Sequence, residues 1–206
     1  MSSTPGSATC QLCDYGQVTS LLWASVPSSV KWGLTVKVRT ADGSQWTALH
    51  RASAAGHGQL AAFLLQRGAS PALPDGHGRT PLHRAAAAGH LPVVRTLLGR
   101  GAAVDPRDGL GLTPLHRAAL GGHAQVAGLL LDRGAQPDAA AGPLRQTPLH
   151  LAARRGHVAV AELLLGRGAS LAPRTRWGDA AADLAPDTAL REALPCRWAG
   201  ITSLYC

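Results

Sequence analysis

Apolar residues recur along the chain at helical spacing, in short stretches that end at glycine. In one such stretch, residues 85–87 are all alanine, and small residues of this kind let a neighbouring helix approach closely. Farther on, Val94, Leu97 and Leu98 stand three and four positions apart, which is typical of one face of an α-helix. The pattern therefore predicts two short helices in succession, the second over residues 91–99.

Start and stop signals flank both predicted helices. The hydroxyl of Thr80 can accept a free backbone N–H at a helix start, and Pro81 suits the first helical position because it has no N–H to lose. Gly89 and Gly101 can adopt the left-handed conformation that ends a helix. One such helix pair cannot bury its apolar face alone, so it must stack on neighbouring pairs.

The same pattern occurs four times. The sequence Thr-Pro-Leu-His, with Ala48 replacing Pro in the first copy, begins at Thr47, Thr80, Thr113 and Thr147, at intervals of 33, 33 and 34 residues. A Gly-His pair follows each copy, and an Arg-Gly-Ala triplet closes each second helix. Four copies in register at several offsets establish an internal repeat.

The repeat resembles the ankyrin-repeat family, which has this period and this signature. The resemblance runs from residue 41 to about residue 194 and implies an all-α solenoid of stacked helix-turn-helix units. We place the repeats at about 42–74, 75–107, 108–141 and 142–174, and a degenerate C-terminal cap at 175–194 with a last short helix over 188–194. Gln45 and Arg145 stand where the family prefers Gly, so the turns there should be looser.

Residues 1–40 and 195–206 do not follow the repeat, and we predict an irregular N-terminal segment and a C-terminal tail. The first repeat lacks the polar outer face of a capping repeat, because Leu49, Leu60 and Leu64 have the character of interior residues. Two explanations remain open: residues 17–40 cover that face, or the chain is a shortened form of a longer array.

Nine histidines among 206 residues invite a search for metal or catalytic chemistry. Eight of them belong to the repeat signature and the Gly-His pairs, where the family uses them as hydrogen-bonding framework residues. Only His77 falls at a predicted turn tip. Cys10 and Cys13 have zinc-like spacing, but no second pair follows them, and Cys196 and Cys206 lie far away in the sequence. We therefore expect no enzyme activity, no catalytic residues, no metal and no cofactor.

The charge balance is basic, with 20 Lys+Arg against 12 Asp+Glu and a formal net charge of +8. Arg51, Arg84 and Arg117 recur one residue after the signature His and should form a ladder along the inner helices. A second concentration of arginine lies between Arg145 and Trp177. A solvated face is one interpretation of these arginines, and an anionic partner is the other.

The resemblance implies protein–protein recognition through the turn tips and the inner-helix surface. Transferring the family's contact positions gives the candidate partner-binding residues Trp46, His77, Arg79, Arg84, Leu110, Leu112, Arg117, Leu120, Leu144, Arg154, Arg155, Arg176 and Trp177. Leucines at turn tips either pack on adjacent turns or form an exposed apolar patch, which tends to mark an interaction site.

We expect a monomeric scaffold in the cytoplasm or nucleus that binds a protein with an acidic surface. No membrane association is expected, because no stretch approaches the ~20 apolar residues of a membrane span. The alternative is a basic nucleic-acid-binding or nuclear regulatory protein, which the net charge suggests. We consider nucleic acid the weaker choice, because no base-stacking or groove-reading motif accompanies the charge.

Overall fold

The computed structural model describes residues 44–186, which contain four successive helix pairs and no strand beyond one isolated bridge. The helices are α2 (Ala48–Ala55), α3 (Gly58–Gln66), α4 (Pro81–Ala88), α5 (Leu91–Gly99), α6 (Pro114–Gly121), α7 (Ala124–Asp132), α8 (Pro148–Arg154) and α9 (Val158–Gly166). The expected all-α repeat fold is confirmed, and so is the helix predicted over residues 91–99.

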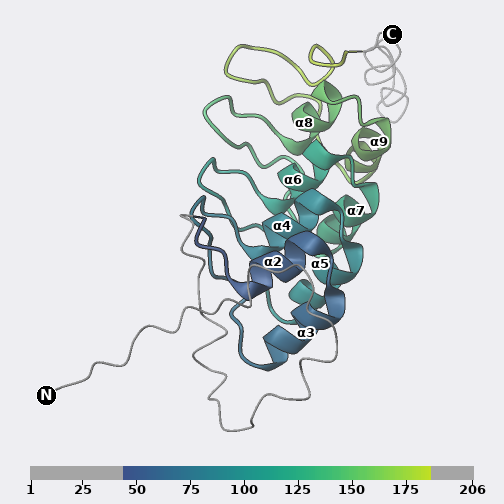
Figure 1. Cartoon of the computed structure of the whole chain (residues 1–206). Helices are drawn as coiled ribbons and strands as arrows, with labels where there is room; N and C mark the ends of the chain where they lie inside the picture. Colours follow the sequence, from purple (N-terminus) through teal and green to yellow (C-terminus); the bar gives the residue numbers. More distant parts are fainter. Residues whose placement is uncertain (1–43, 187–206) are drawn as a thin grey trace, which may run out of the picture. The chain divides into compact units, whose positions relative to one another are not determined.

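The helices form two rows, which Figure 1 shows side by side. In the inner row α2, α4, α6 and α8 contact one another in turn, and in the outer row α3, α5, α7 and α9 do the same. Long turns project to one side of the inner row (Figure 1). The core between the rows is built from leucine and alanine, and Leu82, Leu115 and Leu149 are completely buried.

The signature threonine and histidine fix the start of each inner helix. At α6, the backbone N–H of Thr113 donates to Nδ1 of His116 at 3.2 Å, and the Thr113 hydroxyl lies 2.8 Å from the same nitrogen. Because a backbone N–H can only donate, Nδ1 must be the acceptor, and the proton of the neutral ring must be on Nε2. Nε2 then donates to the carbonyl oxygen of Gln146, in the turn of the next repeat, at 3.1 Å.

The same arrangement repeats along the stack. The Nε2 atoms of the signature histidines reach a carbonyl oxygen of the next repeat: His50 that of Arg79, His83 that of Leu112, His116 that of Gln146 and His150 that of Asp179. The prediction that Thr80 caps its helix is confirmed, because all four threonines form a capping box. In this box the histidine side chain accepts the backbone N–H of the threonine.

The histidines of the Gly-His pairs bond in the opposite direction. Nε2 of His123 lies 3.0 Å from the carbonyl oxygen of Ala87, in the preceding repeat. Gly89 makes room for this ring, because a Cβ at residue 89 would lie 2.5 Å from Nδ1 of His123. Gly89 also has the predicted left-handed backbone, with φ of 76°. His90 and His157 make equivalent bonds to Ala54 and Leu120.

Two predicted departures from the family pattern can be examined directly. Gln45 and Arg145 both adopt φ of 51°, which is the left-handed region that favours glycine. The turn at Arg145 nevertheless closes, because its N–H donates to the carbonyl oxygen of Gly142 at 3.2 Å. The degenerate fifth segment contains turns up to residue 186, with Ala181 and Ala185 buried against the core.

Several predictions concern residues outside 44–186. These are the N-terminal segment 1–40 and its covering role, the helix over 188–194, the tail 195–206 and all four cysteines.

Candidate functional site

Each inner helix presents one face to the side from which the turns project. On α6 this face carries Arg117, Leu120 and Gly121, which stand three and four positions apart and therefore share one side of the helix. Arg117 also lines a hollow of about 490 Å³ together with turn residues 76–79, Gly109 and Leu110. The inner helices and the turn tips thus form one continuous surface, which we call the front face.

Backbone hydrogen bonds join neighbouring turn tips and show which residues are equivalent. The N–H of Gly76 donates to the carbonyl oxygen of Ser44 at 2.8 Å, that of Gly109 to His77 at 2.9 Å, and that of Arg176 to Leu144 at 2.9 Å. The equivalent tip residues, which we call the tip row, are therefore Ser44, His77, Leu110, Leu144 and Trp177.

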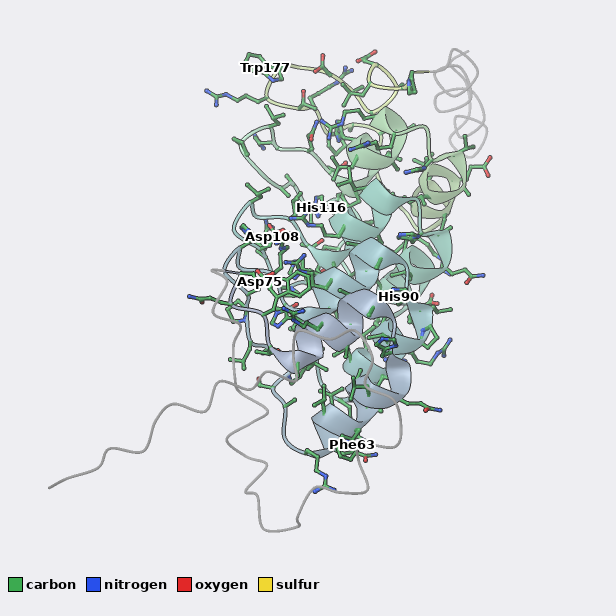
Figure 2. All side chains as sticks on the ribbon, viewed as in Figure 1. Phe63, Asp75, His90, Asp108, His116 and Trp177 are labelled. Carbon is green, nitrogen blue, oxygen red and sulfur yellow. The ribbon has the colours of Figure 1, made fainter. Side chains whose placement is uncertain are left out.

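The tip row becomes apolar toward the C-terminal repeats. Leu110 is 61% exposed and Trp177 is 73% exposed, and Figure 2 shows Trp177 at the outer end of its turn. His77 is exposed as well, whereas Leu144 is half-buried, as are the nearby predicted residues Leu112 and Leu120. Exposed large apolar side chains beside polar groups are a feature of interaction surfaces.

Arg84, a predicted partner-binding residue, is engaged inside the chain. Its Nε and Nη2 atoms donate to Oδ2 of Asp75 at 3.1 and 2.5 Å, and its guanidinium lies over the ring of Trp46, 3.9 Å from the ring centre. Arg79 donates to the same Oδ2 atom at 3.2 Å. Trp46, Arg79 and Arg84 therefore form one cluster around a buried carboxylate.

Asp75 also closes its own turn, since Oδ1 accepts the backbone N–H groups of His77 and Arg79. Burial acts to raise the pKa of Asp75, but these N–H donors and the Arg84 guanidinium outweigh it and hold the pKa at about 2. Asp75 is consequently ionised at neutral pH and is neutralised by the arginines beside it.

Asp108 and Arg117 repeat this arrangement one unit along, and Figure 2 shows Asp75 and Asp108 at equivalent places in successive turns. Oδ1 of Asp108 accepts the N–H groups of Leu110 and Leu112 at 2.9 Å, and Oδ2 accepts Nε of Arg117 at 3.1 Å and its Nη2. These donors lower the pKa of Asp108 against the opposing effect of burial.

The fourth repeat lacks both charges at the equivalent positions. Ala141 replaces the aspartate and forms a backbone bridge with Gln146, and Leu151 replaces the arginine and is 3% exposed. Aspartate and arginine thus occur together or are replaced together. Sequence reasoning missed this pair, although the nine-residue spacing from Asp75 to Arg84, repeated from Asp108 to Arg117, was a visible signal.

Other predicted arginines keep their charge available. Arg154, Arg155 and Arg176 are exposed and make no ion pair with any residue between 44 and 186. Arg51 is likewise exposed, and Asp42, nine residues before it, lies outside the described residues, so the structure shows ion pairs for two members of the predicted ladder, Arg84 and Arg117.

Metal binding and membrane spanning each require a recognisable structural feature. Within residues 44–186 no group of three His, Cys, Asp or Glu side chains is arranged to hold a metal ion. None of the helices in this range has the length and apolar character needed to cross a bilayer.

The stacked helix pairs, the histidine bonds between them and the turn-tip surface define a repeat solenoid with an open recognition face. A family model described as "Ankyrin repeats (3 copies)" matches residues 10–108 and 103–175, so the chain belongs to the ankyrin-repeat family. The first match begins 31 residues before the array predicted from the sequence. A comparison with curated proteins finds no significant match. Ankyrin repeats are generally non-enzymatic modules for protein–protein interaction.

Proposed function

We propose that this protein binds a protein partner through the front face, with the tip row as the main contact. The observation that carries the proposal is the exposure of Leu110 and Trp177 at turn tips that backbone hydrogen bonds connect to their neighbours. An exposed apolar side chain gains free energy when a partner removes it from water, at about 25 cal/mol per Å².

The stack is suited to binding at low entropic cost. Each turn is closed by its own hydrogen bonds, for example by Asp108 in the third repeat, and each inner helix is bonded to the next repeat through its signature histidine. A surface that is ordered before binding loses little conformational entropy when the partner arrives.

Affinity capture from cells with the tagged full chain tests the proposal. The tip variant carries Leu110→Ser and Trp177→Ser. The matched control carries Val158→Ser, because Val158 is 44% exposed at the start of the outer helix α9. We expect one set of proteins to be retained by wild type and control and depleted at least about fivefold with the tip variant. Equal retention by the tip variant would refute the role of the tip row.

The proposal includes the compartment expected from the sequence, the cytoplasm or the nucleus. Fluorescence imaging of the tagged chain tests this part separately.

A further inference from the structure

We infer that the preferred partner segment is an extended acidic peptide whose carboxylates lie on the last two repeats and whose apolar side chain lies near the hollow beside Leu110. This inference rests on the proposed function and adds the chemistry of the ligand. It follows from the different states of the arginines along the front face.

The arginines of the second and third repeats are already neutralised. The Arg84 and Arg117 side chains are only 16% and 17% exposed, and the carboxylates that they bind are 0% and 1% exposed. Binding a second anion there would require breaking a buried ion pair, which generally costs several kcal/mol. An acidic ligand therefore gains little binding free energy from Arg84 and Arg117.

The last two repeats are different, because Arg154, Arg155 and Arg176 are exposed there and lack ion-pair partners within the residues that the structure describes. Arg154, the last residue of α8, and Arg155, its C-cap, correspond to Leu120 and Gly121 of α6, and Arg176 lies in the tip next to Trp177. The acidic residues nearest to Arg176 in sequence are engaged elsewhere: Asp183 pairs with Arg174, and Oδ2 of Asp179 accepts the Thr175 hydroxyl. Guanidinium groups bind carboxylates strongly, often through two parallel hydrogen bonds.

The floor of the earlier repeats leaves space for a peptide backbone. The positions equivalent to Arg154 and Arg155 are Ala87 and Ala88 in the second repeat and Leu120 and Gly121 in the third. The hollow between the second and third tips, about 490 Å³ in volume, has the exposed Leu110 on its wall. An aliphatic or aromatic side chain of the ligand fits this place.

The repeat spacing predicts how many residues separate the apolar side chain of the ligand from its carboxylates, and we call this prediction the sequence rule. Packed helices lie about 8–10 Å apart, and an extended chain advances about 3.3 Å per residue, so about three ligand residues span one repeat. The fourth and fifth repeats are one and two units beyond the hollow. We therefore expect at least two carboxylates about three to six residues from the apolar side chain.

The uneven charge favours such a peptide over a nucleic acid. A nucleic acid carries negative charge along its whole length and is bound by a continuous track of cations. Here the exposed cations of the front face include Arg51 in the first repeat and Arg154, Arg155 and Arg176 in the last two, whereas Arg84 and Arg117 between them are neutralised by Asp75 and Asp108, so the track of cations is interrupted.

A displayed library of random peptides of about 12 residues, long enough to span four repeats, tests the inference. The full-length wild-type chain is compared with a front variant, Arg154→Glu, Arg155→Glu and Arg176→Glu. The matched control, Arg95→Glu, Arg100→Glu and Arg133→Glu, changes net charge equally at exposed positions in the outer row and at helix ends. Circular dichroism establishes that each variant melts like wild type, and a triple glutamine variant of the front arginines replaces any front variant that does not fold.

We expect wild type and control to enrich peptides that follow the sequence rule, in either chain direction. Synthetic copies should bind the front variant at least about tenfold more weakly, and should bind wild type more weakly at 300 mM than at 50 mM NaCl. Enriched peptides without acidic bias, or acidic peptides that bind the front variant equally well, would overturn the inference and leave the proposed function standing. If no peptide were enriched at all, the inference would fail, whereas the proposed function would still be decided by the affinity capture. If a 20-nucleotide oligothymidine bound wild type more tightly than the peptides do, and if this binding were lost in the front variant, the ligand would be a nucleic acid and the inference would be overturned.

Discussion

Mild acid should destabilise the stack through its buried signature histidines. His116 is completely buried, its Nδ1 accepts the Thr113 N–H, and burial lowers the pKa of its ring to about 4. The pKa values of His83 and His150 are lowered for the same reason. In the unfolded chain a histidine has its ordinary pKa of about 6.5, so the unfolded state takes up the proton first as the pH falls. Stability is therefore full above about pH 6.5 and is lost progressively toward pH 4.

The loss of folding stability can be calculated from the lowered pKa of His116. A change from 6.5 to about 4 for His116 corresponds to about 3 kcal/mol once the unfolded histidine is fully protonated, and to about 2 kcal/mol at pH 5. The carboxylate of Asp75, with a pKa of about 2, contributes below pH 4 and does not overlap this range. The loss between pH 7 and pH 5 thus reports on histidine.

Urea unfolding at half-unit steps between pH 5 and pH 7.5 measures this loss. The variant His116→Gln should be less stable at pH 7, since one side-chain amide does not reproduce both ring contacts, but its stability should depend less steeply on pH. The slope should fall by up to about 1.4 kcal/mol per pH unit, the contribution of one proton. His77→Gln is the matched control for the substitution itself, because His77 is exposed at a turn tip. Equal slopes for wild type and His116→Gln would refute the reasoning.

Three further substitutions have defined expectations for the free energy of unfolding, measured by urea denaturation. Ser53→Ala should stabilise the chain by about 1 kcal/mol, because the Ser53 hydroxyl is buried and has no hydrogen-bond partner among residues 44–186; a loss of stability would contradict this. Arg145→Gly should add about 0.5–1 kcal/mol by relieving the left-handed backbone, and an unchanged midpoint would argue against strain there. Arg117→Leu should cost about 3 kcal/mol, because it leaves the Asp108 carboxylate buried without its cation. Adding Asp108→Ala should recover part of that loss, and purely additive losses would show that the two residues are not coupled.

The fold was predictable because each repeat carries its own local instructions. Thr80, Pro81 and Gly89 mark the ends of a helix within ten residues, and four copies of these marks in register leave little choice of architecture. The role of the histidines was also accessible, but only through the family resemblance, because their acceptors lie about 29 to 37 residues away. Nothing local to His116 points to the carbonyl oxygen of Gln146.

The candidate site was less predictable, because exposure and charge pairing depend on how the turns pack. Arg84 and Arg154 both lie in an inner helix within four residues of a signature histidine, yet Arg84 is bound to a buried aspartate and Arg154 is exposed. The difference arises nine residues before Arg84, at Asp75, in a turn that folds back onto the inner helix. A pattern search confined to one helix does not find this contact.

The joint replacement of aspartate and arginine in the fourth repeat has a genetic consequence. A single substitution at either position would leave a buried charge without its partner, so the change from Asp and Arg to Ala and Leu passes through a weakened intermediate when it occurs one codon at a time. Duplication or conversion of a short block of DNA moves both codons together, since they are about ten codons apart. Repeats in this chain can therefore exchange these positions as a unit more readily than they can acquire them separately.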